Sequence, residues 1–302
     1  MPLKIAISFI FLFLFVMRSH AEELSDDDFL SLSLEQLLHI QVVSSNGIEE
    51  ELIDAPAAML VLTRKEIALR GYNNLAEVLS DLPGFDVIHT GGGSNNTAYQ
   101  RGYRTPFTTR TLFMIDGRVE NGLWSQQVLL SRQYPINMIS RIEVLYGPAS
   151  VKYGANAFLG VINVITKKGI ELKEGRSELS IKGEVGSWNS KGLSIFSRGH
   201  YGDFSYDVSA RVFSSDEEDL SERWGFLSKQ LYSDEKIWGP ILSLSNDGTS
   251  FGQYTDNTDD WGIFAKLKYN NFTFGYNRWQ IDEGYGTTFA ADKAQNNGDW
   301  LR

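Results

Sequence analysis

The feature that most constrains this chain is a strict alternation of apolar and polar residues that begins after Gly175. A period of two places the apolar members of each run on one face of a β-strand. The apolar positions of the successive runs are Leu179, Ile181 and Val185; Leu193 and Ile195; Phe204, Tyr206, Val208, Ala210 and Val212; Trp261, Ile263, Ala265, Leu267 and Tyr269; and Phe272, Phe274 and Tyr276. Residues 177–302 therefore predict strands with one apolar and one polar face, which fits a soluble sandwich as well as a membrane barrel.

The connections between these runs fall into two lengths. Gly202-Asp203 and Asn270-Asn271 predict tight two-residue turns, whereas residues 215–260 and about 282–297 predict long polar loops. Residues 215–260 carry eleven Asp or Glu against three Lys or Arg. We expect a solvated acidic loop there; its carboxylates are also ligands of the kind that calcium uses, although they lack the spacing of an EF-hand.

Helices and strands are expected to alternate upstream. The expected order is a strand at 58–62, a helix opening at Thr63 and closed by Gly71, a helix at 74–82 stopped by Pro83-Gly84, and a strand at 85–88. Thr63 and Glu66 form the pattern of a capping box. Within residues 141–168, two β-prone runs flank the turn signal Gly147-Pro148. This part of the chain predicts a compact α+β unit.

The order of residues in 141–168 strongly resembles the end of the plug domain of TonB-dependent outer-membrane receptors. The family's Arg-Ile-Glu-Val, Gly-Pro-x-Ser, Tyr-Gly and Gly-Val-Ile-Asn-x-Ile-Thr-Lys elements stand here at Arg141–Val144, Gly147–Ser150, Tyr153-Gly154 and Gly160–Lys167. Arg101-Gly102 and the strand 112–115 ending in Asp116-Gly117 match as well. The resemblance implies an α+β plug domain at residues 49–170, followed at 177–302 by the first strands of an antiparallel transmembrane β-barrel.

The two kinds of connection agree with that implication. If the first strand rises from a periplasmic plug, both tight turns lie on the periplasmic side and both long loops lie outside, as in outer-membrane barrels. At ~9–11 residues per strand, 126 residues hold about five or six strands. Plugged transporters have about 22. We therefore expect an incomplete barrel, from an N-terminal fragment of a longer product or a truncated one, which would not form a working channel alone.

The first 21 residues predict a cleaved secretory signal peptide. Lys4 lies ahead of an apolar run from Ile5 to Met17, and Ser19-His20-Ala21 supplies a small-x-small cleavage site. A membrane-anchoring helix is the alternative, but the run is shorter than the ~20 residues that span a bilayer. With the resemblance, the expected location is the outer membrane of a Gram-negative cell.

Residues 22–48 form an N-terminal segment that contains a β-prone pentamer: Ile40, Gln41, Val42, Val43 and Ser44. In the resembled family this position holds the TonB box, which pairs edge to edge with a strand of the periplasmic protein TonB. An extended segment with free N–H and C=O groups suits strand addition. The alternative is an ordinary first strand of the plug.

Two further groups of residues are candidates for function. By motif position, the resemblance implies that Arg101, Arg141 and Glu143 belong to a buried plug charge network, the alternative being solvated surface charges. The run Gly91, Gly92, Gly93, Ser94, Asn95 and Asn96 predicts a flexible, ligand-facing apical loop. No Gly-Lys-Ser/Thr follows the glycines, which excludes a nucleotide-binding loop.

The sequence lacks the patterns of common enzymes. There is no Gly-x-Ser-x-Gly, no His-Glu-x-x-His and no cysteine, and the four histidines are scattered. We expect no enzymatic activity, no cofactor and no metal site. A net charge of −10 argues against a nucleic-acid partner.

The resemblance implies a receptor for TonB-energised uptake of a scarce solute. Its expected partners are TonB, outer-membrane lipid and an extracellular ligand such as a ferric siderophore, the family's usual cargo. Cobalamin, haem and glycans are alternative cargoes. A non-transporting outer-membrane binding or signalling receptor, and a soluble periplasmic α+β binding module with a β tail, remain alternative classes.

Overall fold

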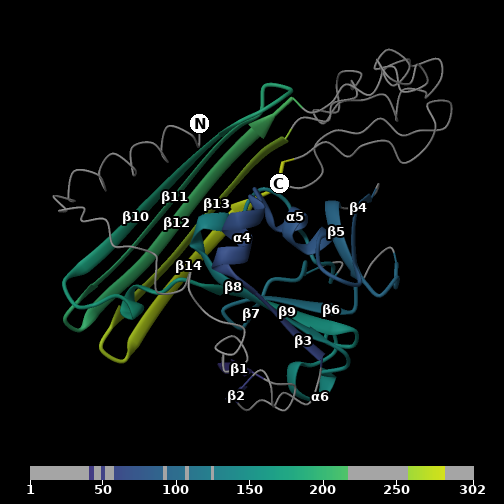
Figure 1. Cartoon of the computed structure of the whole chain (residues 1–302), viewed down its shortest axis with the longest axis horizontal. Helices are drawn as coiled ribbons and strands as arrows, with labels where there is room; N and C mark the ends of the chain where they lie inside the picture. The colour runs from purple at the N-terminus through teal and green to yellow at the C-terminus, as the bar shows by residue number, and fades with distance from the viewer. Residues whose placement is uncertain are drawn as a thin grey trace.

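The computed structural model describes residues 41–43, 49–51, 58–90, 94–105, 109–123, 126–216 and 258–282. Two bodies are visible, an α+β unit and a long antiparallel sheet that runs along one side of it (Figure 1). The predicted signal peptide, most of residues 22–48 and most of both long polar loops lie outside the described residues.

The α+β unit is built on a mixed sheet of five strands in the order β3-β8-β9-β6-β7, here called the central sheet. β6 and β9 are parallel and the other pairs are antiparallel. Its elements are β3 (Ala58–Thr63), α4 (Arg64–Arg70), α5 (Leu75–Ser80), β4 (Phe85–Thr90), β5 (Ser94–Gln100), β6 (Thr111–Ile115), β7 (Arg118–Val119), η2 (Ile136–Met138), β8 (Ile139–Tyr146), α6 (Ser150–Tyr153), β9 (Gly160–Thr166) and η3 (Gly169–Glu171). β4 and β5 form a separate hairpin.

The two predicted helices begin where their caps place them. Thr63 N donates to the Glu66 carboxylate at 2.8 Å while Glu66 N donates to Thr63 Oγ1, which completes the predicted capping box. Gly71 ends α4 in the left-handed conformation, with φ of 72°. α5 ends at Ser80, before the predicted Leu82, because Asp81 already takes the C-cap position ahead of Pro83.

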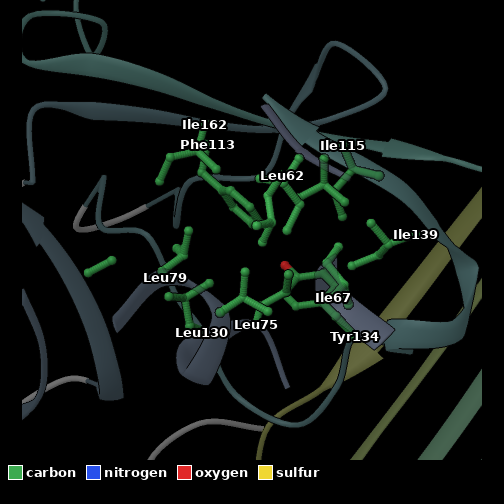
Figure 2. Packing of buried hydrophobic residues seen from close by; sticks show 14 of the residues in the cluster. Leu62, Ile67, Leu75, Leu79, Phe113, Ile115, Leu130, Tyr134, Ile139 and Ile162 are labelled. Atoms are coloured by element: carbon green, nitrogen blue, oxygen red, sulfur yellow. The ribbon is translucent and has the colours of Figure 1, made fainter. Parts of the chain in front are cut away.

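Apolar side chains from the helices and the central sheet form one core. Figure 2 shows Leu62, Phe113 and Ile162 of the sheet packed toward Leu75 and Leu79 of α5. The same cluster extends to the second body through Tyr134, whose ring lies 5.6 Å from that of Phe264. The α+β unit is therefore packed onto the long sheet as well as within itself.

The second body is an antiparallel meander of five consecutive strands. The strands are β10 (Arg176–Val185), β11 (Lys191–Tyr201), β12 (Phe204–Ser215), β13 (Thr258–Tyr269) and β14 (Phe272–Gln280). Tyr201 pairs with Phe204 and Tyr269 with Phe272, which confirms both predicted tight turns. β12 and β13 reach further into the predicted acidic loop than expected, because Asp259 and Asp260 pair with Ser214 and Phe213.

In a soluble sandwich the apolar face of each sheet is buried. In this meander the apolar face is exposed and the polar face is buried. Leu179 and Ile181 on the predicted apolar face are 52% and 62% exposed. Arg211 and Ser209 on the polar face are 2% and 3% exposed, because that face packs against the α+β unit. Apolar residues that face away from the core are typical of strands in contact with lipid. In the part of the chain that the structure describes, no helix is long and apolar enough to cross a membrane.

Candidate functional site: the seam between the two bodies

The polar face of the meander and the α+β unit meet along a seam of charged groups, and Asp116 is its first contact. Asp116 and Gly117 form the predicted tight turn, with φ of 49° and 77°. The Asp116 carboxylate accepts hydrogen bonds from Thr166 N at 2.9 Å and from Thr166 Oγ1 at 2.6 Å. It also accepts one from Lys266 Nζ of β13 at 2.6 Å. The turn thus joins the end of β9 to the meander.

Asp116 is held in its ionised form. Burial acts to raise its pKa, but the hydrogen bond and the charge of Lys266, together with the bonds from Thr166, hold the pKa below its ordinary value. The contact between Asp116 and Lys266 is therefore an ion pair at neutral pH, with most of its surface removed from water.

A second group of charges lies where the chain passes from one body to the other. Arg198 of β11 contacts Glu178 of β10 at 2.6 Å and Glu171 of η3 at 3.1 Å. The buried Lys167, directly after β9, lies 3.6 Å from Glu178. Glu178 is therefore shared by a cation from each body, so that the connection is fixed to the first two strands of the meander.

A third group fixes the loops of the α+β unit. Arg211 of β12 binds the two carboxylate oxygens of Glu184 at 2.8 and 3.0 Å, and its Nε donates to the backbone oxygen of Arg132 at 2.7 Å. Lys182 of β10 donates to Asn73 Oδ1 at 2.9 Å. Buried Asp260 accepts from Arg132 N at 3.2 Å and so lies in the seam, although it was predicted to lie in a solvated loop.

Two glycines allow the backbones of the two bodies to touch. A Cβ at Gly169 of η3 would overlap the backbone oxygen of Tyr206, and one at Gly262 of β13 would overlap that of Gln133. Neither position has a left-handed backbone, so close approach is the reason for glycine at both.

Between these contacts lies a cavity of about 150 Å³. Its polar lining includes Asp116, Thr166, Asp207, Ser209, Lys266 and Asn277. Both bodies contribute to the lining, so the cavity is part of the seam. No group of His, Cys, Asp and Glu within the described ranges is arranged to hold a metal ion.

The predicted plug charge network is brought together only in part. Arg141 Nη2 lies 2.8 Å from Glu143, which is 5% exposed on β8. Arg101 is exposed and lies over the ring of Tyr146 at 6.0 Å, so its place in a charge network stays a prediction. Arg101 follows β5 in a turn with φ of 58°, which directs it to the aromatic surface at the end of β8. The charges that bridge the two bodies, such as Asp116 and Lys266, were missed from the sequence. Two features could have indicated them: the Asp-Gly turn, and the charged residues on the polar face of the alternating strands.

The predicted apical loop is shorter than expected. Ser94, Asn95 and Asn96 belong to β5, where Ser94 pairs with Thr90 of β4. Pairing with β4, with its register shift between Ile88 and Thr90, overrides the weak strand propensity of these polar residues. Gly91, Gly92 and Gly93 lie outside the described residues. A ligand-facing role for this run stays a prediction.

The predicted TonB box is extended where the structure describes it. Gln41, Val42 and Val43 form β1, which pairs antiparallel with β2 (Glu49–Glu51). Ile40 and Ser44 lie outside the described residues. Extended geometry agrees both with strand addition and with the plain alternative of a structural strand, so the assignment stays a prediction.

An α+β unit held by charges against the polar face of a meander, whose apolar face points outward, has the architecture of a plug seated on part of a membrane β-barrel wall. Comparison with known proteins agrees. Residues 51–161 match the family model of the TonB-dependent receptor plug domain. Residues 51–161 thus carry a plug domain of the kind found in TonB-dependent receptors.

Two relatives and one solved structure illustrate the similarity. An iron-regulated outer membrane virulence protein of Vibrio cholerae is 30% identical over 196 residues, which cover 61% of this chain and 29% of that protein. The vitamin B12 transporter BtuB of Vibrio vulnificus is 31% identical over 149 residues, covering 49% and 22%. The ferripyoverdine receptor of the outer membrane of Pseudomonas aeruginosa, bound to ferripyoverdine, has the same fold with a TM-score of 0.57 at 17% identity, covering 81% of this chain and 28% of that one. The chain thus spans less than a third of the length of these curated relatives.

Proposed function

We propose that this chain is the plug and first wall strands of a receptor in the Gram-negative outer membrane that takes up a scarce solute with energy delivered by TonB. The observation that carries the proposal is the inverted meander, apolar outward and charged toward the plug. A plug seated on polar and ionic contacts can leave a barrel without exposing a large apolar surface, which a purely apolar seam would not allow.

The strand order supports a route for the pulling force. β3 is an edge strand of the central sheet and pairs only with β8 among the described strands. Tension applied at residues 40–44 would therefore reach the central sheet first at a strand that is paired on one side only. An edge strand yields before a central one because only one ladder of hydrogen bonds holds it.

The proposed cargo is a ferric siderophore. The iron-regulated Vibrio cholerae relative, together with the similarity in fold to a ferripyoverdine receptor, favours an iron-bearing ligand. Cobalamin is the second candidate, because the similarity to a vitamin B12 transporter is of the same strength.

The test is uptake by the full-length receptor in a Gram-negative strain that lacks its own siderophore and cobalamin receptors. We expect accumulation of ⁵⁵Fe supplied on a panel of siderophores, and loss of that accumulation when TonB is deleted. Accumulation of ⁵⁷Co-cobalamin in place of iron would assign the second cargo. Binding without TonB-dependent accumulation of either would favour a non-transporting receptor, and recovery in the soluble periplasmic fraction would overturn the membrane assignment.

A further inference from the structure

Lys266 of β13 lies between two carboxylates that belong to different bodies. One is Asp116 of the plug, 2.6 Å from Lys266 Nζ. The other is Asp207 of β12, which is the direct partner of Lys266 in the register of β12 and β13. Residues paired in this way point to the same face of the sheet, with Cβ atoms about 4.5–5.5 Å apart. Asp207 is therefore within reach of the lysine side chain.

Asp207 is not used by the seated plug as an ion-pair partner. Its carboxylate accepts a hydrogen bond from the backbone N–H of Gly169, and among the described residues no salt bridge to it is found. The nearby cations other than Lys266 are engaged elsewhere: Arg118 pairs with Glu120, and Arg198 with Glu171 and Glu178.

The lysine has room to move between the two acids. Asp116, Asp207 and Lys266 all line the cavity of about 150 Å³ that separates the plug from the wall. A lysine side chain is long, flexible and able to bond as a point charge from many directions. It can therefore turn from one carboxylate to the other without any movement of the strands.

We propose that Lys266 is a positioning residue that exchanges partners: it holds Asp116 while the plug is seated and passes to Asp207 as the plug leaves. This inference rests on the proposed function, because it assigns the exchange to the opening of the lumen. Removing one partner of a buried ion pair is costly, since the remaining charge is left unpaired before water arrives. Asp207 removes that cost at the moment of separation and so lowers the barrier to release.

The test measures the opening rate of the plug in the purified full-length receptor. Ser209 of β12 faces the plug and is buried, so a near-isosteric Ser209→Cys on a chain without cysteine reports separation when it reacts with a bulky maleimide. The rate of labelling is measured with saturating maleimide, at a urea concentration just below the one that unfolds the plug. In this background Asp207→Asn keeps the acceptor for Gly169 N–H but removes the charge.

We expect Asp207→Asn to slow labelling about tenfold, Asp207→Glu to restore it, and Asp116→Asn to speed it. If Asp207 only helps to seat the plug, Asp207→Asn will leave labelling unchanged or make it faster, and the proposal is wrong. Lys266→Gln supplies the coupling control: in that background Asp207→Asn should have no effect, and an equal slowing there would also overturn the exchange. Labelling needs neither TonB nor cargo. Failure of uptake in the experiment above would therefore reject the proposed function and leave the labelling result standing.

Discussion

At the scale of single residues, the seam depends on positions where the two backbones have no room for a side chain. Gly262 is the clearest case, since its missing Cβ is where the backbone of Gln133 lies. Overpacking at such a site typically costs about 1–3 kcal/mol. We expect Gly262→Ala to displace the plug segment around Gln133 and to lower the urea midpoint of plug release.

Gly275→Ala is the matched control, because Gly275 lies in the neighbouring strand β14 and nothing lies within 4 Å of a Cβ added there. In cells carrying the full-length receptor, the Gly262 variant should also increase sensitivity to antibiotics too large for ordinary porins. Equal behaviour of the two variants would show that the close approach is not a seating contact.

The ion pair of Asp116 predicts a pH dependence with a definite sign. Its pKa in the folded protein is held below its unfolded value by Lys266 and Thr166 against the effect of burial. A carboxyl of this kind contributes its full stabilisation above the unfolded pKa, about 3.9, and loses it as the pH falls through the lower folded value. We expect plug seating, followed by the urea midpoint of plug release, to weaken only below about pH 4 on account of this group.

In Asp116→Asn that component of the acid dependence should vanish, because the amide does not titrate in this range. A loss of seating at pH 6 to 7 that Asp116→Asn abolishes would contradict the assignment of the lowered pKa.

At the scale of elements, the extended segment β1 is expected to couple the receptor to TonB by main-chain pairing. Val42→Pro removes one N–H donor and restricts Gln41, so it should abolish uptake while leaving ligand binding from outside intact. Val42→Thr keeps the β-branched shape and should be mild. Binding and uptake are measured in each variant of the full-length receptor. Normal uptake by the Val42→Pro variant would show that the TonB box lies elsewhere. Loss of both uptake and ligand binding would show that the segment has a structural role.

The elements also show how far sequence reasoning reaches. Local signals with a single physical meaning were correct: the capping box at Thr63, the Asp116-Gly117 turn and the two tight turns of the meander. Predictions failed where pairing between distant segments decided the outcome. Ser94–Asn96 are strand because β4 lies beside them, and Asp260 is buried because Arg132 donates to it across the seam. Likewise, nothing local distinguishes exposed Arg101 from paired Arg141.

At the scale of the whole molecule, the plug carries nearly all of its own core. Among the described residues of the buried apolar cluster, Phe196 and Phe264 come from the meander, and partly buried Trp279 of β14 packs against the cluster. We therefore expect residues 22–170 alone to fold as a soluble and marginally stable domain. Hydrogen exchange should protect Val161–Ile165 in the centre of the central sheet more than residues 89–99, which include the predicted apical loop.

Equal protection of residues 89–99 and of Val161–Ile165 would count against a ligand-probing role for residues 89–99. A chain of residues 22–170 with no protected amides would show that the wall is needed for the plug to fold.

The connection between the two bodies is short: nine residues lie between Thr166, the last of β9, and Arg176, the first of β10. A tether of this length keeps a displaced plug at an effective concentration of the order of millimolar relative to its seat. Return is then a unimolecular process whose rate does not depend on how many receptors the cell makes. Under the proposed function, we therefore expect work to be needed only for departure of the plug. Once the load is released the pore would reclose spontaneously, and the time under tension would limit the leakage in each cycle.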